Sequence, residues 1–366
     1  MNTRSKELTV SPYFAFFLVH SLQIGVGILG FQRILIKRAG YDAWISLILM
    51  GFATHIVLFC MLAMLEKDND LINIHTTCFG KWIGSFFSLC FTAYFLLFCL
   101  TILQTYIEII QVWVFPTLKS WKLNVLFLFI VFYVIKGGFR SVTGICFWGI
   151  VIPFFVIFFL IFPMKYAHFR NILPILTHSP LQIFQSAKDS ILEFLGFEAL
   201  LFVYPLIEKG KSLKRWAHGG IALTTIIYVI LALISFMYFS EGLLQRTIWA
   251  TLTMLKIIKI PFIQRFEYII IFVWFLIILP NLCVTIWSSC QSMKRSFHIP
   301  FKFTLPFFIF VVYIASLFII NREHINTLNT LLSRAGLYIV YVYIPLLFLW
   351  HSIRWRLKNK QNKTSP

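Results

Sequence analysis

One stretch decides how this chain folds: Asp189-Ser-Ile-Leu-Glu-Phe-Leu-Gly-Phe-Glu-Ala-Leu-Leu-Phe-Val-Tyr-Pro205. It is apolar enough to lie in a bilayer, yet Glu193 and Glu198 flank Gly196. A carboxylate in hydrocarbon costs about 2.5 to 3.5 kcal/mol on insertion scales, so such residues usually face a bundle interior or a water-filled cavity. Because glycine accepts unusual backbone angles, the segment suits a helix that opens near its middle. A continuous helix with a packing glycine and neutral or paired glutamates is the alternative.

Composition places the chain in a membrane. Hydrophobic residues make up 60% of it and charged residues only 12%, with a mean hydropathy of +0.85. A soluble domain carries about 25% charged residues. Apolar blocks recur from end to end and leave no room for a soluble domain. The sequence therefore predicts an all-α integral membrane protein with a single membrane domain over residues 1–366.

Taking about 20 apolar residues as one span, the sequence predicts ten membrane helices. They are expected at Pro12 to Ile36, Tyr41 to Leu65, Trp82 to Val114, Leu123 to Ile135, Val142 to Phe162, Ser186 to Ile207, Gly219 to Phe239, Phe262 to Gln291, Phe301 to Ile320 and Gly336 to Trp355. Short interfacial helices are expected in the segments Pro163 to Gln185 and Ser240 to Pro261.

The basic residues are spread along the chain. The formal charge is +19, but the lysines and arginines lie in short segments between apolar blocks, a pattern typical of membrane-flanking anchors rather than of nucleic-acid binding. A modest Lys/Arg excess, and the two densest clusters, Lys209 to Arg215 and Arg354 to Lys363, fall on one side. The positive-inside rule then predicts cytoplasmic N- and C-termini.

The first span contains Gln23-Ile24-Gly25-Val26-Gly27-Ile28-Leu29-Gly30. Its Gly-x-Gly-x-x-Gly spacing imitates a dinucleotide fingerprint, which needs a preceding strand and a soluble fold. The glycines therefore serve either packing or an unwound point whose free amides bind an anion. Corresponding interruptions in two halves point to a binding site between repeats. The break near Gly196, five spans later, thus predicts two inverted five-helix repeats with broken first and sixth helices.

This arrangement divides the chain into five parts. We expect a cytoplasmic N-terminus at 1–11, a first repeat at 12–162, an outer connection at 163–185, a second repeat at 186–355 and a basic cytoplasmic tail at 356–366.

Other polar side chains lie within predicted spans. Hydroxyls in membrane helices more often satisfy a carbonyl one turn back than bind a ligand, and a lone membrane histidine is more often hydrogen-bonded to a neighbouring helix. Both interpretations stay open at this stage. The residues concerned are Tyr94, Gln104, Glu108, Thr285, Ser288, Ser289, His20 and His55.

The sequence argues against an enzyme. It contains no nucleophile-base-acid order, no zinc-type Cys/His cluster and no phosphate loop, so neither a metal nor a cofactor is expected. The seven cysteines fall mostly inside apolar blocks and form no Cys-x-x-Cys pair. We expect them to be small packing residues.

Five pieces of the chain carry a family resemblance: Ile24-Gly25-Val26-Gly27-Ile28-Leu29, Trp44-Ile45-Ser46-Leu47-Ile48-Leu49, Gly80-Lys81-Trp82-Ile83-Gly84-Ser85, Phe194-Leu195-Gly196-Phe197-Glu198 and Phe262-Ile263-Gln264-Arg265-Phe266-Glu267. In this order they resemble the spore germination permeases, the B subunits of germinant receptors, within the amino acid/polyamine/organocation superfamily. The resemblance covers nearly the whole chain. It implies a LeuT-like fold and a place in the inner membrane of the spore or the bacterial cell membrane.

The resemblance also implies roles. A small germinant, typically an amino acid, would bind near the breaks, and an A subunit and a lipoprotein C subunit would complete the receptor. Gly25 to Gly27 would offer amides to the ligand carboxylate, and Phe194 to Phe197 would line the pocket for the ligand side chain. Glu198 would hold the opened helix or meet the ligand ammonium. Tyr94, Thr285 and Ser288 complete the expected binding set, and Glu108, Glu193, Arg265 and Glu267 are expected in structure or coupling.

Two rival functions stay open, a transporter because the expected fold permits it and a structural subunit because the chain departs from the family pattern. Gln32 and Ala250 stand where prolines are expected, Gln104 stands for an arginine, and Glu193 is additional. The rivals are a proton- or sodium-coupled amino acid transporter and a structural receptor subunit without a ligand. The fifth span, Val142 to Phe162, lacks a lysine or acid for proton coupling.

Overall fold

The chain is helical almost throughout. The computed structural model describes residues 9–210, 212–258 and 265–364, with side chains through residue 357. Within this part, six helical segments are long and apolar enough to cross a membrane, and two shorter apolar helices accompany them. The six are Gln32–Asp68, Leu71–Trp113, Phe139–Met164, Ser212–Tyr238, Phe266–Ser296 and Arg322–Leu357. Such a set of apolar helices makes the protein a multi-pass membrane protein.

The elements of the first half are α2 (Phe14–Gln23), η1 (Gly27–Leu29), α3 (Gln32–Ala39), η2 (Gly40–Asp42), α4 (Ala43–Asp68), α5 (Leu71–Trp113), α6 (Ser120–Lys136), α7 (Phe139–Val151), η3 (Pro153–Leu160) and α8 (Ile161–Met164).

The second half contains η4 (Phe169–Ile172), α9 (Pro180–Asp189), η5 (Ile191–Phe194), η6 (Phe197–Ala199), α10 (Leu200–Val203), η7 (Tyr204–Leu206), α11 (Ser212–Tyr238), α12 (Glu241–Arg246), α13 (Ala250–Leu255), α14 (Phe266–Ser296), α15 (Phe301–Leu317), α16 (Arg322–Gly336), the π-helical η8 (Leu337–Tyr343) and α17 (Ile344–Thr364).

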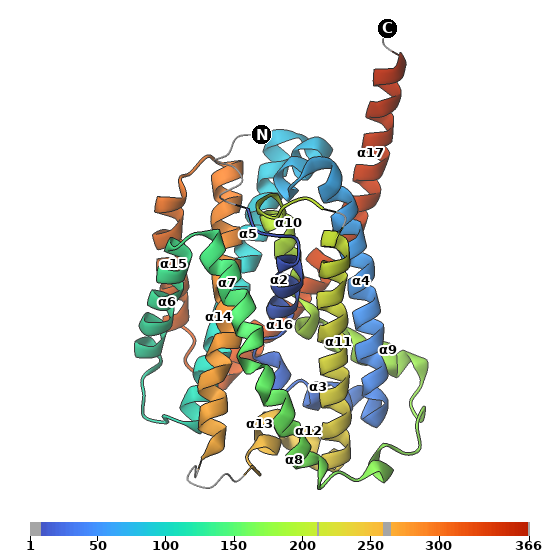
Figure 1. Ribbon diagram of the computed structural model, residues 1–366, viewed down its shortest axis with the longest axis vertical. Coiled ribbons are helices and arrows are strands. Elements are labelled where there is room, and N and C mark those ends of the chain that lie inside the picture. The colour runs from blue at the N-terminus through green and yellow to red at the C-terminus, as the bar shows by residue number, and fades with distance from the viewer. Residues whose placement is uncertain (1–8, 211, 259–264, 365–366) are drawn as a thin grey trace.

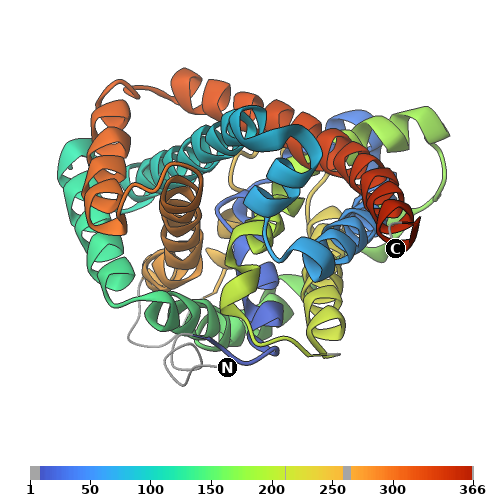
Figure 2. The ribbon, with the colours of Figure 1, turned by 90° about the horizontal axis from the view of Figure 1, so that it is seen from above.

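Long helices enclose the two interrupted segments. In Figure 1 the long helices run roughly along the vertical axis, with α2 near the middle and α17 projecting at the top. Seen from above, α2 and α10 lie inside the surrounding helices (Figure 2). The side chains agree, because every residue of α10 is buried. The core of the molecule is therefore built around the places where helices stop.

The predicted spans overlap the helices, although α5 begins at Leu71 rather than at Trp82 and α11 begins at Ser212 rather than at Gly219. The expected short helices are present in both connecting segments, as η4 and the start of α9 in the first and as α12 and α13 in the second. The start of the predicted eighth span, 262–264, lies outside the described residues, as does part of both predicted terminal segments.

The predicted start of the tenth helix is wrong. Helical structure begins at Arg322, not at Gly336, and continues from α16 through η8 into α17. The error has a physical cause, because α16 is amphipathic. It buries Ile325, Leu328 and Leu332 on one face and is mostly polar elsewhere, so its average hydropathy does not identify it as part of a membrane span.

Candidate functional site

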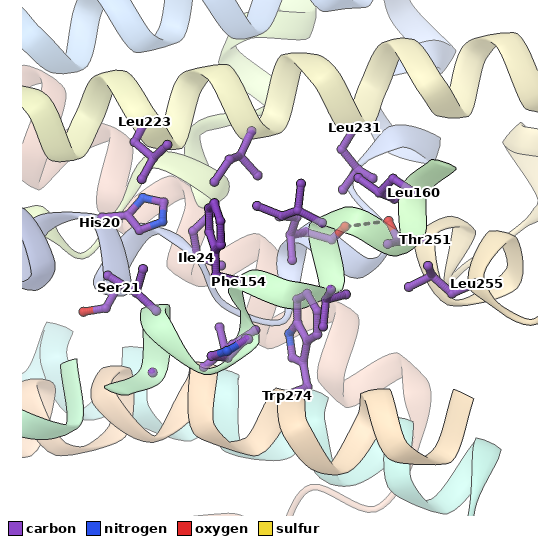
Figure 3. Close-up of a pocket in the computed structure, with 18 residues that line it drawn as sticks. His20, Ser21, Ile24, Phe154, Leu160, Leu223, Leu231, Thr251, Leu255 and Trp274 are labelled. Atoms are coloured by element: carbon purple, nitrogen blue, oxygen red, sulfur yellow. Dashed lines mark hydrogen bonds between the residues drawn. The ribbon is translucent and has the colours of Figure 1, made fainter. Parts of the chain in front are cut away.

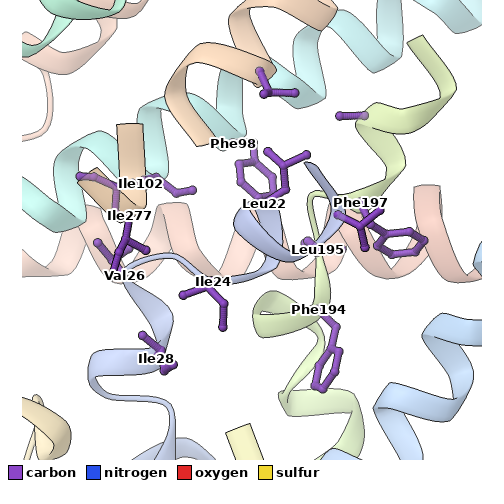
Figure 4. Packing of buried hydrophobic residues seen from close by; sticks show 14 of the residues in the cluster. Leu22, Ile24, Val26, Ile28, Phe98, Ile102, Phe194, Leu195, Phe197 and Ile277 are labelled. Carbon is purple, nitrogen blue, oxygen red and sulfur yellow. The ribbon is translucent and has the colours of Figure 1, made fainter. Parts of the chain in front are cut away.

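Two helix interruptions meet at the centre of the molecule. α2 ends at Gln23 and regular α-helix resumes at Gln32, and the chain is extended at Leu195 between η5 and η6. Gln23 Nε2 donates a hydrogen bond to the Phe194 carbonyl over 3.2 Å. Figure 4 shows the two segments side by side, with Ile24 and Val26 on one and Phe194 and Leu195 on the other. The broken helices predicted from the glycines therefore lie in direct contact.

Gly196 makes this contact possible. Its φ of +104° lies in the region that favours glycine. A Cβ at this position would lie 2.6 Å from the Leu22 carbonyl oxygen. A residue with a side chain would be strained at this φ and would clash with the Leu22 carbonyl, so the second interruption depends on glycine for two separate reasons.

Side chains already use the carbonyls of the first interruption. Asn281 Nδ2 donates to the carbonyls of Ser21 at 2.9 Å and Ile24 at 3.1 Å. Tyr228 donates to the Gln23 carbonyl at 3.0 Å and Trp274 to the Gly25 carbonyl at 3.2 Å. Thr251 donates to the Ile28 carbonyl at 2.8 Å. Four side chains from α11, α13 and α14 thus replace the helical bonds lost where α2 opens.

The amides of the same interruption have no such partners. Within the described chain, the amides of Gly25, Val26 and Gly27 donate no hydrogen bond to another residue. All three residues line a cavity of about 270 Å³. Unpaired amides at a broken helix favour an anionic group, so the cavity wall here suits a carboxylate.

We call this space the central cavity. It is lined by residues of α2, α3, α5 and η5 and by single residues of α11 and α14, and α16 and the segment between α12 and α13 complete its wall. Ile34, Ile248 and Asn326 on its rim are exposed, and their elements lie in the middle and lower part of Figure 1, away from the end of α17. The volume is just below the usual range for small-molecule sites, about 300 to 1,000 Å³, and suits a small solute.

The two glutamates occupy different environments. Glu198 is fully buried, and its two carboxylate oxygens accept from the Tyr94 hydroxyl at 2.5 Å and the Gly196 amide at 2.8 Å. Glu193 lines the central cavity, where its Oε2 is buried without a hydrogen-bond partner among the described residues. This geometry favours Glu198 as the residue that holds the opened helix and leaves Glu193 facing the cavity.

The remaining predicted binding residues lie behind the cavity wall. Phe194, Leu195, Gly196 and Phe197 are buried between helices and do not line the central cavity. Thr285, on α14, donates to the Asn281 carbonyl at 2.7 Å, the local bond expected of a membrane hydroxyl. Ser288 is buried on the same helix. Their roles in ligand binding stay predictions.

Charged candidates elsewhere are paired. Glu108 pairs with Arg322 of α16, whose guanidinium also lies over the Trp249 ring at 5.1 Å from its centroid. Arg322 and Trp249 line the central cavity. Arg265 pairs with Glu267 at 2.9 Å, with the arginine half exposed. Glu108 therefore has an ion-pair partner, although the arginine expected one turn before it is replaced by Gln104.

Gln23, Asn281 and Arg322 line the central cavity and were not predicted as site residues from the sequence. Asn281 follows Pro280 in an apolar stretch, and a carboxamide beside a proline inside a membrane helix was the available signal. Arg322 was missed because the start of α16 was assigned to a loop. Of the two interpretations of His20, the contact with a neighbouring helix is observed, because its Nδ1 lies 2.8 Å from Thr224 Oγ1 on α11.

A second, smaller cavity lies beside the first interruption. It measures about 100 Å³, and its lining, which includes Ile24, Phe154 and Trp274, is almost wholly apolar (Figure 3). It lacks the unpaired amides and the carboxylate that mark the central cavity. The central cavity is therefore the candidate functional site.

Comparisons with known proteins agree with this architecture. The chain is 43% identical to spore germination protein GerQB of Bacillus cereus, over 96% of this chain and 98% of that protein. It is 22% identical to spore germination protein A2 of Bacillus subtilis (strain 168), over 95% of each chain. Its fold is similar to that of a substrate-bound, outward-open Na⁺-coupled sialic acid symporter, with a TM-score of 0.61 and 13% identity over 95% of this chain and 77% of the symporter. Residues 9–325 match the family model of the spore germination permeases, described as spore germination protein, and the chain belongs to this family.

Proposed function

We propose that this protein is the germinant-sensing subunit of a spore germination receptor, with the central cavity as its ligand site. One observation carries the proposal: the two helix interruptions meet at a cavity that presents unpaired amides on one side and the Glu193 carboxylate on another. This arrangement suits a small zwitterion such as an amino acid. A permease family and a symporter-like fold favour solute binding over catalysis.

We infer a ten-helix topology for the receptor subunit. The interruptions in α2 to α3 and in α9 to α10 support two inverted five-helix repeats. Both termini lie in the cytoplasm, the chain sits in the inner membrane of the spore, and the A and C subunits receive its signal. Ligand binding favours one arrangement of the repeats only through differential affinity. A shift from 1:99 to 99:1 takes roughly 5.5 kcal/mol of such differential binding.

The proposal is tested by a substitution that fills the central cavity in the intact receptor. A Cβ on Gly25 meets only Ile102 Cδ1, at 3.8 Å, and the residue lines the central cavity. Gly25→Trp should therefore place an indole in the ligand space and abolish or shift the germinant dose response of spores. Gly144→Trp is the matched control, because a Cβ there meets nothing within 4 Å.

Glu198→Ala removes the hydrogen bonds that hold the second interruption and should also impair the response. An unchanged dose response in both Gly25→Trp and Glu198→Ala, at normal protein levels, would refute the sensing role.

Transport is the second candidate, because the fold is similar to that of a Na⁺-coupled symporter. Uptake of labelled amino acids into vesicles that contain this subunit alone, under proton and sodium gradients, tests it. Accumulation that depends on either gradient would favour transport over sensing alone. If no ligand stabilises the protein and no solute accumulates, a structural role in the receptor remains.

A further inference from the structure

Three buried acceptor oxygens around the first interruption have no hydrogen-bond partner among the described residues. They are Gln23 Oε1, Glu193 Oε2 and Asn281 Oδ1, and each residue is at most 3% exposed. All three residues line the central cavity. Buried polar atoms are normally satisfied by protein or by water, so three such acceptors in one wall leave room for the hydrogen-bond donors of water or of a ligand.

The hydrogen bonds of the two carboxamides determine where their oxygens point. Asn281 Nδ2 donates to the carbonyls of Ser21, Ile24 and Ile277. Gln23 Nε2 donates to the Phe194 carbonyl. Turning either amide over would set its oxygen against carbonyl oxygens, so both oxygens must face away from the backbone they support.

Glu193 approaches the same interruption from η5. Its Oε1 lies 3.5 Å from the position that a Cβ on Gly27 would take. The carboxylate therefore faces the glycines of the first interruption rather than the interior behind them. It places a carboxyl group beside two neutral acceptor oxygens.

We propose that Glu193, Gln23 and Asn281 bind the primary ammonium group of the ligand. The assignment rests on the proposed sensing function and names the chemical class of its ligand. An alkylammonium has three N–H donors and no acceptor, which matches three acceptor oxygens, one of them on a carboxyl group that can carry the opposite charge. The carboxylate end of an amino acid would then reach the unpaired amides of Gly25 to Gly27.

The geometry favours an ammonium over an alkali cation. In broken-helix transporters, unwound backbone carbonyls coordinate the coupling ion. Here the carbonyls of Ser21, Gln23, Ile24, Gly25 and Ile28 already accept hydrogen bonds from side chains. Most carbonyls that would face an ion at the first interruption are therefore in use, and the three side-chain oxygens are the unpaired side-chain acceptors of the cavity wall.

The experiment measures binding to the purified full-length protein. The probes are the standard amino acids and methylammonium, with acetate, propionate and isovalerate as the deaminated counterparts of glycine, alanine and valine. Sodium chloride is compared with choline chloride at constant ionic strength. The variants are Glu193→Gln, which removes the charge, and Glu193→Asp, which keeps it. Glu323→Gln is the matched control, an exposed acid on α16 next to Arg322.

We expect at least one ammonium compound to bind the wild-type protein and its deaminated counterpart not to bind. Loss of a charged hydrogen-bond partner should weaken that binding about 10- to 150-fold in Glu193→Gln. Glu193→Asp should retain part of the affinity, and Glu323→Gln should match the wild type. Equal affinity in Glu193→Gln, or binding of the deaminated acid, would overturn the assignment.

Two other results separate this assignment from the sensing function. Stabilisation by sodium alone, lost in Glu193→Gln, would make the three oxygens a metal-cation site and overturn the ammonium assignment. No binding by any ammonium compound would overturn it too, while a defective germination response in Gly25→Trp would leave the sensing role intact. An unaffected response in both Gly25→Trp and Glu198→Ala would refute the sensing role itself.

Discussion

Tyr94 on α5 donates its hydroxyl proton to Glu198 Oε1 across 2.5 Å in the buried centre of the molecule. The other oxygen of the same carboxylate accepts from the Gly196 amide at 2.8 Å. One side chain thus connects α5 to the open turn of the second interruption. Because both oxygens are used, this pair has the geometry of a structural brace.

Removing the Tyr94 hydroxyl tests the brace. Tyr94→Phe leaves a buried carboxylate oxygen without its donor, which should cost about 1 to 3 kcal/mol of unfolding free energy. Denaturant unfolding in detergent measures the loss. Tyr133→Phe is the control, because Tyr133 is 73% exposed on α6. Similar stabilities for the two variants would show that the bond to Glu198 does not stabilise the fold.

The approach of Gly196 to Leu22 predicts a costly substitution. Gly196→Ala combines a positive φ with a Cβ placed 2.6 Å from a carbonyl oxygen. Gly80 also has a positive φ, of 79°, but a Cβ there meets nothing within 4 Å. Both variants should suffer backbone strain of about 1 to 3 kcal/mol, and only Gly196→Ala should add about 1 to 3 kcal/mol of overpacking. Equal thermal stabilities would contradict this account.

Asp70 combines two roles that substitutions can separate. Its Oδ1 accepts from the Asn73 amide at 2.8 Å and caps α5, and its Oδ2 pairs with Arg295 at the end of α14. Asn is as good a cap as Asp, so Asp70→Asn should keep the cap and lose the contacts of Oδ2 with Arg295 and with Asn73 Nδ2, together worth about 1 kcal/mol. Asp70→Ala should lose roughly another 1 kcal/mol with the cap. Denaturant unfolding of the two variants would refute the capping role if their stabilities were the same.

The ion pair between Glu108 and Arg322 lies beside the central cavity and should restrict access to it. Glu108→Gln removes the pair but leaves Arg322 over Trp249. A loss of about 1 kcal/mol would raise the population of open molecules roughly fivefold. The readout is the labelling rate of Thr105→Cys, which lines the cavity.

The labelling experiment requires a protein without other reactive thiols and a control variant that loses a different negative charge. Cys90 is the exposed native cysteine, so Cys90→Ser removes the main competing thiol. Glu323→Gln in the same background removes a neighbouring charge from α16 and should leave the rate unchanged. An unchanged rate in Glu108→Gln as well would show that the ion pair does not control access.

The candidate site was predictable from the sequence only in part. The glycines at 25, 27 and 196 indicated both interruptions, because a missing side chain acts locally on the backbone. The face on which a polar side chain points is not a local property. Glu193 and Glu198 are five positions apart in one segment, yet one lines the cavity and the other braces Gly196.

The sequence by itself determined the membrane class, the approximate positions of most helices and the two interruptions, because hydropathy and glycine content act through neighbouring residues. Only the tertiary structure decided the partners of the opened backbone. Asn281, Trp274, Tyr228 and Thr251 reach the first interruption from three other helices, and Arg322 reaches Glu108 from α16. These contacts depend on how each helix is rotated against its neighbours, and helix packing sets that rotation.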